Sequence, residues 1–206
     1  KNEIELADFE DAKDKIIMGL ERKNAVISEK SRRLAAYHEA GHAAVAKILP
    51  DTDPIHRITI IPRGRAGGGT FFLPEDDRTE VSKDWCLDTI TQSLGGRVAE
   101  ELMFEDVTTG ASNDLERATE LARKMVTRYG MSEALGPMTF GQKEELVFLG
   151  REISEQRDYS DAVAQQIDQE VRHFVDEAHD RAKQALEDHR DSLVAVATRL
   201  IEIETL

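Results

Sequence analysis

The sequence predicts a mainly α fold, a helical domain with one small β-sheet or hairpin. Apolar residues recur at helical spacing over most of the 206 residues. Aromatic residues make up only 5%, which suits an alanine-lined helical interior better than a β-sandwich. One cluster of β-branched residues, at 56–61, has the composition of a strand, and a second short strand candidate follows at 70–73.

The first part of the chain is predicted to form two helices. Apolar residues at helical spacing indicate a short helix that ends near Gly19, followed by a connector at 21–26. Ser28 or Ser31 can cap the second helix, which ends at Pro50 because proline cannot continue it.

A hairpin is expected next. Turn residues at 51–54 precede the first strand candidate, and a glycine-rich loop at 63–69 leads to the second. No Gly-Lys-Ser/Thr follows this loop, so the phosphate-binding pattern of nucleotide-binding proteins fails. The loop is either a flexible hairpin connection or part of an exposed strand edge that binds an extended peptide. The residues favour neither alternative.

The second half is again helical. Ser82 can cap a helix that runs to Phe104, and the pair Gly95-Gly96 inside it indicates either close contact with another helix or a kink. A turn at 108–114 leads into a helix that Gly130 can end.

The last third is predicted to be a mobile surface loop at 144–157 and a pair of helices. Ser160 opens the longer of these helices, and the second runs to about Ile203. Their acidic faces are expected to be solvated. Four histidines have no partner at ligand spacing, and no chemistry is assigned to them: His56, His173, His179 and His189.

Composition and charge exclude several classes of protein. The net charge of −14 argues against a nucleic-acid partner, because such a surface needs a basic face. The single cysteine, Cys86, excludes an intramolecular disulfide framework and is expected to be a small buried hydrophobe. No run approaches the roughly 18 apolar residues that span a membrane. The sequence begins within a helical pattern, so we expect a fragment of a longer protein.

The second helix carries a His-Glu-x-x-His pattern. Positions i and i+4 lie on one face of a helix, so His38 and His42 can bind one zinc ion together. Glu39 lies about 100° round the helix from His38, which suits a base acting on water better than a third ligand. Gly41 lowers helix stability, which indicates that another segment passes close by. A solvated helix face is the alternative to a metal site.

The third ligand is left open by spacing. A catalytic zinc ion usually has three protein ligands and one position for water. Glu100 and Glu101 lie downstream on a helix, and Asp114 lies in the first turn of another. The helix dipole alone can account for an acid at that position. Spacing therefore ranks these three carboxylates equally.

Several stretches together resemble the protease domain of the FtsH family, which comprises ATP-dependent, membrane-anchored AAA zinc peptidases of the M41 type. The matching stretches occur in family order, and a further match follows at 131–137. They are YHEAGH at 37–42, IIPRGR at 60–65, LGGRVAEE at 94–101 and VTTGASNDL at 107–115.

The resemblance implies a site. His38, His42 and Asp114 would hold one zinc ion per chain, and Glu39 would be the catalytic base. Glu100 and Glu101 would not be ligands, although one of them would orient a ligand histidine.

The resemblance also implies that residues 67–73 form the edge that aligns substrate. The edge residues would be Gly68, Gly69, Thr70 and Phe71. The fold expected from the resemblance is a helical zinc-metallopeptidase domain with its small sheet or hairpin near the active site.

The implied function is that of a zinc-dependent endopeptidase module of an ATP-dependent, membrane-anchored protease. It would hydrolyse peptide bonds of unfolded or membrane proteins by metal-activated water, and it would form a homo-oligomer, a hexamer. ATP and Mg²⁺ would act only through an ATPase module that this sequence lacks. The full-length protein would be membrane-anchored through segments outside this sequence. The domain would lie on the cytoplasmic, organelle-matrix or stromal side, and the fragment itself would be soluble.

The expected domain boundaries follow. Residues 1–27 would be the tail of the ATPase module with a connector, and residues 28–206 the zinc peptidase domain. That domain would divide into a catalytic part, 28–157, and a C-terminal helical pair, 158–206. The alternative function is a noncatalytic helical assembly or chaperone-like module with a structural metal. The distance of Cys86 from the histidines and the intact Glu39 argue against it.

Overall fold

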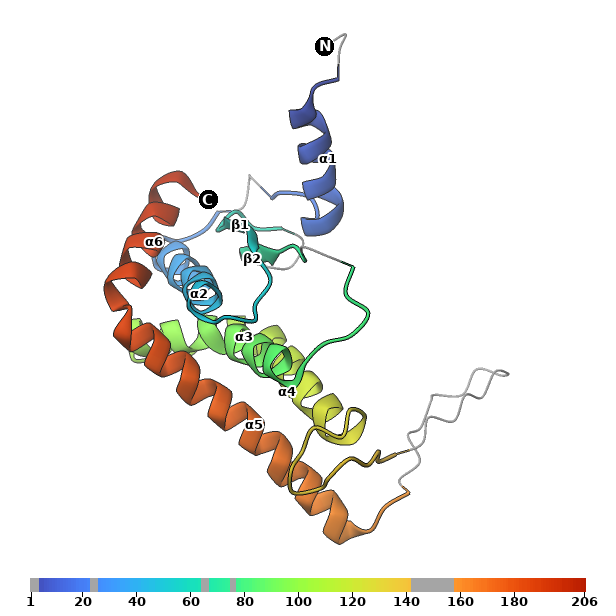
Figure 1. The fold of residues 1–206 in the computed structure, drawn as a ribbon. Helices are drawn as coiled ribbons and strands as arrows, with labels where there is room; N and C mark the ends of the chain where they lie inside the picture. The colour runs from blue at the N-terminus through green and yellow to red at the C-terminus, as the bar shows by residue number, and fades with distance from the viewer. Residues whose placement is uncertain (1–3, 23–25, 64–66, 75–76, 142–157) are drawn as a thin grey trace.

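The computed structural model describes residues 4–22, 26–63, 67–74, 77–141 and 158–206. Within these ranges the fold is mainly helical with one small antiparallel hairpin, which confirms the predicted fold class (Figure 1). The elements are α1 (Leu6–Met18), α2 (Glu29–Ile48), β1 (Ile55–Thr59), β2 (Gly69–Phe72), α3 (Lys83–Phe104), the 3-10 turn η1 (Thr109–Ala111), α4 (Ser112–Thr127), α5 (Asp161–Asp188) and α6 (Arg190–Ile203).

Helices α2 and α3 pack with their backbones in contact. A Cβ atom on Gly41 of α2 would overlap the carbonyl oxygen of Gly95 of α3. A Cβ atom on Gly95 would lie 2.7 Å from the carbonyl oxygen of Gly41. The close approach predicted at Gly41 is therefore confirmed. α3 continues through its glycine pair, and Gly95 provides the helix contact, the first of the two alternatives.

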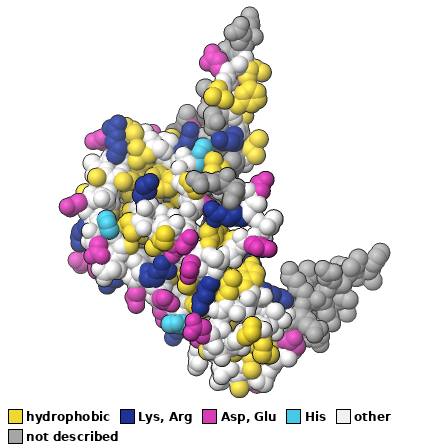
Figure 2. Space-filling view, in the orientation of Figure 1, with side chains coloured by type: hydrophobic (Ala, Val, Ile, Leu, Met, Phe, Trp, Pro, Cys, Tyr) yellow, Lys and Arg dark blue, Asp and Glu magenta, His cyan; other side chains and the backbone are white. Residues whose placement is uncertain are grey.

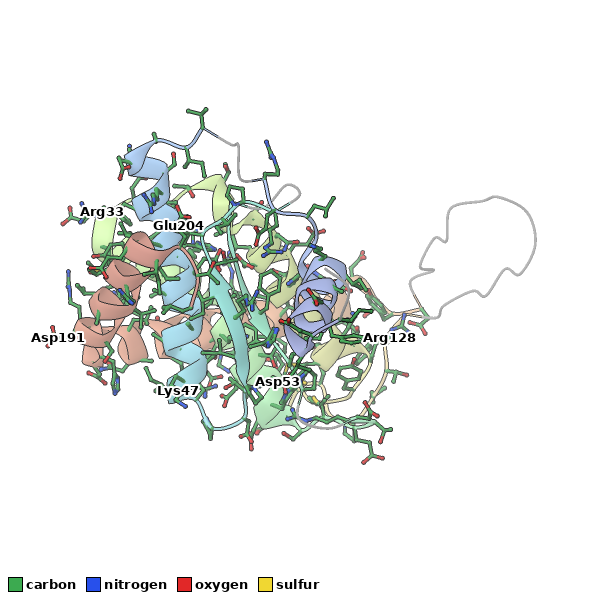
Figure 3. The ribbon with its side chains drawn as sticks, turned by 90° about the horizontal axis from the view of Figure 1, so that it is seen from above. Arg33, Lys47, Asp53, Arg128, Asp191 and Glu204 are labelled. Carbon is green, nitrogen blue, oxygen red and sulfur yellow. The ribbon has the colours of Figure 1, made fainter. Side chains whose placement is uncertain are left out.

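The hairpin lies alongside α2. Seen from above, its strands run beside this helix, with Arg33 near one end of α2 and Lys47 near the other (Figure 3). Ile58 of β1 faces Thr70 of β2 in the antiparallel register. Ser28, one of the two predicted caps, accepts a hydrogen bond from the Ser31 amide at 3.1 Å and so fixes where α2 begins.

The C-terminal residues pair with the other edge of β1. The Ile58 amide donates to the Leu206 carbonyl at 2.9 Å, and the Leu206 amide donates back at 2.8 Å. The Ile60 amide donates to the Glu204 carbonyl and so continues this pairing. The ladder with β2 stops at Thr59 opposite Gly69, so β1 ends two residues before the predicted end. In the described part of the chain, no segment pairs with the outer edge of β2.

Two hydrophobic clusters hold the helices together. One lies between α2, the hairpin and α6, and the other lies between α3, α4 and α5. α5 contributes to both, because its buried residues recur every three or four positions along one face. These residues are Ile167, Val171, Phe174, Ala178, Ala182 and Leu186. Ser160 caps α5 as predicted, and Cys86 is fully buried in the second cluster.

Helix α1 projects away from the rest of the molecule (Figure 1). The apolar side chains that the structure describes on it are exposed, 65% for Phe9 and 84% for Ile16, and hydrophobic atoms gather on this segment in Figure 2. Arg63 joins the segment after α1 to the hairpin, because its guanidinium donates to the Gly19 carbonyl at 2.9 Å and pairs with Glu21. The boundary predicted at residue 27 stays a prediction.

Two further predictions concern the segment after α4. The chain turns at Gly130, with φ +61°, just after α4 ends at Thr127, and the Met131 amide satisfies the Met125 carbonyl at 2.9 Å. The surface loop predicted at 144–157 lies outside the described residues.

None of the helices in the described ranges has the length and apolar character needed to cross a bilayer.

Candidate metal centre

Three side chains from two helices converge on one point. His38 and His42 of α2 bring their Nε2 atoms to 3.1 Å from each other. Asp114, in the first turn of α4, places Oδ2 at 3.2 Å from His38 Nε2 and 3.5 Å from His42 Nε2. Both histidines are buried, and Asp114 is partly exposed. The structure therefore brings together the three residues named as zinc ligands.

These distances match what a zinc ion requires. A tetrahedral zinc ion with ligand bonds of about 2.0–2.1 Å holds its ligand atoms about 3.3–3.4 Å apart. The three measured separations, 3.1, 3.2 and 3.5 Å, lie around that value. Two nitrogens and one carboxylate oxygen are also donor atoms that zinc accepts. The residues present therefore fit the metal that the motif predicts.

The second nitrogen of each histidine is held by an acceptor. His38 Nδ1 lies 2.8 Å from Glu100 Oε1, and His42 Nδ1 lies 2.8 Å from the carbonyl oxygen of Gln92. Both acceptors favour a proton on Nδ1, which leaves the Nε2 lone pairs facing the common point. Glu100 is itself fixed, because its Oε2 accepts from the Thr108 amide at 2.9 Å.

Gly96 makes room for both imidazoles. A Cβ atom at this position of α3 would lie 2.5 Å from His42 Nε2 and 2.6 Å from His38 Cε1. Gly95 and Gly96 therefore have different roles, since Gly95 contacts the backbone of α2 and Gly96 contacts the imidazoles of His38 and His42. The sequence pattern indicated close contact at this pair but did not indicate its relation to the site.

The turn before α4 brings Asp114 to the histidines. The Thr108 hydroxyl accepts from the Gly110 amide at 3.1 Å, which closes a short turn that continues through η1 into α4. Asp114 then lies in the first turn, where the helix dipole also favours a carboxylate. The same turn contacts Glu100, so the segment that leads to Asp114 is joined to α3 beside His38.

Glu39 is buried next to the three converging side chains. The Thr70 hydroxyl lies 2.9 Å from Glu39 Oε2 and 3.0 Å from the Glu39 carbonyl oxygen. Burial raises the pKa of Glu39, and the charges of His42 and His38 together with the Thr70 hydroxyl partly offset that effect. A carboxyl group with a raised pKa in such a place suits the uptake and release of a proton.

The centre is strongly polarised in the absence of a metal. Burial disfavours the His38 imidazolium, but the hydrogen bonds that it donates to Asp114 and Glu100 outweigh this effect and raise the pKa of His38 to about 10. Burial also opposes ionisation of Asp114, yet its contacts with His38 and His42 hold the pKa of this carboxyl well below its usual range. The pKa of Glu100 is lowered in the same way, by His38 and Thr108 against the effect of burial. The site therefore stabilises positive charge.

The two remaining carboxylate candidates have separate positions. Glu100 binds the Nδ1 side of His38, so it orients a histidine that points at the metal position. Glu101 faces away and contacts His179 at 2.9 Å and Arg97 at 2.9 Å. Gln92 and Thr108 were not identified from the sequence, because both act through backbone atoms that carry no residue signal.

The residues of the expected substrate edge lie beside Glu39. Gly68 precedes β2, and Gly69, Thr70 and Phe71 belong to it. A Cβ atom on Gly68 would lie 3.1 Å from Glu39 Oε1, so the start of β2 passes directly over the carboxylate. The centre thus combines three possible metal ligands, a buried carboxyl group and a strand edge. Such a combination can hold a divalent cation and deliver a proton next to an extended chain.

Comparison with known proteins gives a consistent result. The model of peptidase family M41 matches residues 25–206. A protein named ATP-dependent zinc metalloprotease FtsH 1 from Thermoanaerobacter sp. (strain X514) is 54% identical over 99% of this chain and 33% of its own length. Relatives with similar names from Sphaerobacter thermophilus and Rubrobacter xylanophilus are each 53% identical over the whole chain. The chain spans about a third of the length of these curated relatives.

Proposed function

The chain belongs to peptidase family M41, and we propose that it is the zinc-dependent endopeptidase module of an ATP-dependent protease. The observation that carries this proposal is the convergence of His38, His42 and Asp114 at ligand-to-ligand distances that fit zinc, with Glu39 buried beside them. Only three side chains of the described residues form this cluster, which fits a catalytic site with an open position better than a closed structural site.

A zinc ion held by His38, His42 and Asp114 would polarise water and the substrate carbonyl. The chain's own residues would do the rest. Glu39 would accept a proton from the attacking water and transfer it to the leaving amine. Glu100 and the Gln92 carbonyl would keep the two imidazoles in the tautomer and orientation that binding requires.

Substrates are proposed to be unfolded or membrane proteins and peptides that bind as an extended strand. The outer edge of β2 supports this proposal, because the C-terminal residues occupy the other edge of the hairpin. Backbone groups at such an edge can pair with any extended chain, which suits a protease of broad specificity. Gly68, Gly69, Thr70 and Phe71 would form the contact surface.

Properties of the longer protein are proposed from the relatives' names and the family resemblance. ATP and Mg²⁺ would act through an ATPase module outside this chain, and residues 1–27 would be the connector to that module. The protein would be anchored in a membrane, with this domain on the cytoplasmic, matrix or stromal side, and would assemble as a hexamer. The domain would extend from 28 to 206, with 158–206 as its C-terminal helical pair.

The proposal is tested by cleavage of casein, an unfolded protein substrate, with the zinc-loaded chain. We expect cleavage that a chelator abolishes and that zinc restores. Glu39→Gln should bind zinc normally and cleave at least a hundredfold more slowly, a loss at the low end of the range for removal of general-base catalysis. Zinc binding without chelator-sensitive cleavage would instead support the noncatalytic assembly or chaperone-like module with a structural metal.

A further inference from the structure

Thr70 links the free strand of the hairpin to Glu39. Its hydroxyl oxygen lies 2.9 Å from Glu39 Oε2 and 3.0 Å from the Glu39 carbonyl oxygen, while its backbone belongs to β2 opposite Ile58. A threonine hydroxyl has one proton, so it donates to one of these acceptors at a time or is shared between them. In both cases β2 is bonded to α2 at the residue expected to act as the base.

In the part of the chain that the structure describes, the buried Glu39 carboxylate has few hydrogen-bond donors around it besides Thr70. Its residue exposure is 7%, and a buried carboxylate needs hydrogen bonds to compensate for lost water. The Thr70 hydroxyl is the side-chain donor to this carboxylate among the described residues. On one side Gly68 packs so closely that a Cβ atom there would lie 3.1 Å from Glu39 Oε1. Contact with Gly68 therefore restricts the space open to the Glu39 carboxylate, and the hydrogen bond from Thr70 fixes its orientation.

We propose that Thr70 is a positioning residue that holds the Glu39 carboxylate in the orientation needed for proton transfer. The inference rests on the proposed peptidase function, because it assigns Thr70 a role in the same proton transfer. It differs from the edge contact itself, since the side chain acts on Glu39 and the backbone acts on substrate.

The test compares Thr70→Val with Thr70→Ser in the zinc-loaded chain. Valine keeps the shape and strand preference of threonine but removes the hydroxyl, whereas serine keeps it. We expect Thr70→Val to lower kcat for peptide cleavage about tenfold, as for one lost hydrogen bond to a charged group. KM should stay within about twofold, because the backbone edge that binds substrate is unchanged. Thr70→Ser should recover most of the lost kcat.

A matched control lies in the same hairpin. The Thr59 hydroxyl contacts Thr205 at 2.8 Å and the Glu204 carbonyl at 3.2 Å, and neither contact involves Glu39. Thr59→Val should lower the midpoint temperature of unfolding and leave kcat unchanged. An equal fall of kcat in Thr59→Val and Thr70→Val would overturn the inference, since general weakening of the hairpin would then explain both.

Two readouts besides activity complete the test. Zinc content should stay at one ion per chain in Thr70→Val, and a crystal structure of that variant should show the Glu39 carboxylate rotated or in several orientations. Loss of zinc, or an unchanged carboxylate with full kcat, would overturn the role of Thr70. If the unmodified chain binds zinc but cleaves nothing, the proposed function fails and this inference fails with it. Cleavage by the unmodified chain with full kcat in Thr70→Val rejects only the inference.

Discussion

Glu100 accepts two hydrogen bonds from opposite sides, and one of them comes from His38. Glu100 Oε1 lies 2.8 Å from His38 Nδ1, and Glu100 Oε2 accepts from the Thr108 amide at 2.9 Å. A carboxylate can accept both bonds because it has no proton of its own, whereas an amide group offers only one acceptor oxygen. Glu100 therefore joins His38, a proposed zinc ligand, to the turn that precedes α4 and Asp114.

The first prediction concerns this pair. Glu100→Gln must turn its NH₂ group toward either His38 Nδ1–H or the Thr108 N–H, so one hydrogen bond is lost. We expect zinc affinity to fall about tenfold, at the low end of the range for such outer partners of a metal site. Competition with a fluorescent zinc chelator measures the change. Glu101→Gln is the control, because Glu101 contacts His179 and Arg97 instead, and its affinity should not change.

The second prediction uses the glycine pair of α3. In Gly96→Ala the new methyl group meets the imidazoles of His42 and His38, which can rotate away in the metal-free protein. We expect zinc binding to be lost while the metal-free protein keeps its helical circular dichroism. Zinc titration followed by calorimetry measures the effect. Normal zinc binding by Gly96→Ala would contradict the proposed position of the metal between these rings.

The third prediction concerns the neighbouring glycine. In Gly95→Ala the methyl group meets the Gly41 carbonyl oxygen, a backbone atom that cannot move without displacing α2. We expect a loss of about 1–3 kcal/mol in the unfolding free energy, the usual cost of overpacking in a tight interior. Urea denaturation of the metal-free protein measures it. An alanine tolerated at both Gly41 and Gly95 without loss of stability would show that the two helices are not in backbone contact.

Sequence reasoning succeeded where the signal was local. His38, Glu39 and His42 share one helix, so their spacing alone defines a face, and Gly41 indicated the close approach of a second helix. Asp114, Glu100 and the histidines come together only through the packing of α3 and α4 on α2. Their roles therefore could not be separated by spacing, and only the family resemblance distinguished them.

Other features were missed for physical reasons. The Gln92 carbonyl that holds His42 is a backbone atom, so any residue type at that position could supply it. The end of β1 was predicted two residues too late, because Ile60 is as suitable for a strand as Ile58. The ladder with β2 stops at Thr59 because β2 begins opposite it at Gly69, a long-range pairing that no local pattern records.

The fourth prediction is that zinc binding releases protons and strengthens with pH. In the metal-free protein the pKa of His38 is raised to about 10. Protonation of His38 therefore stabilises the folded chain by its full amount below the ordinary pKa of about 6.5, and this stabilisation is lost as the pH rises through 10. A zinc ligand must be neutral, so the ion competes with this proton. We expect the apparent zinc affinity to rise by up to about tenfold per pH unit between pH 6.5 and 10.

Calorimetry in buffers of different ionisation enthalpy measures the protons released per zinc ion at pH 7.5. His38 alone predicts about one proton from the chain, because the depressed pKa of Asp114 keeps that carboxylate ionised throughout this range. Asp114→Asn removes the charged hydrogen-bond partner that contributes most to raising the pKa of His38, so this variant should release fewer protons as well as bind zinc more weakly. Zinc affinity independent of pH would show that His38 does not carry the displaced proton.

The fifth prediction concerns removal of the metal. Zinc that binds the folded chain and not the unfolded one stabilises it by about 2.7 kcal/mol when the free ion is a hundredfold above its dissociation constant. For a chain of this size that corresponds to a rise of roughly 5–11 °C in the unfolding temperature. Differential scanning calorimetry with and without a chelator measures the rise. Asp114→Asn should show a much smaller rise, because one ligand is weakened, whereas Glu39→Gln should show the full rise, because Glu39 lies beside the metal without binding it.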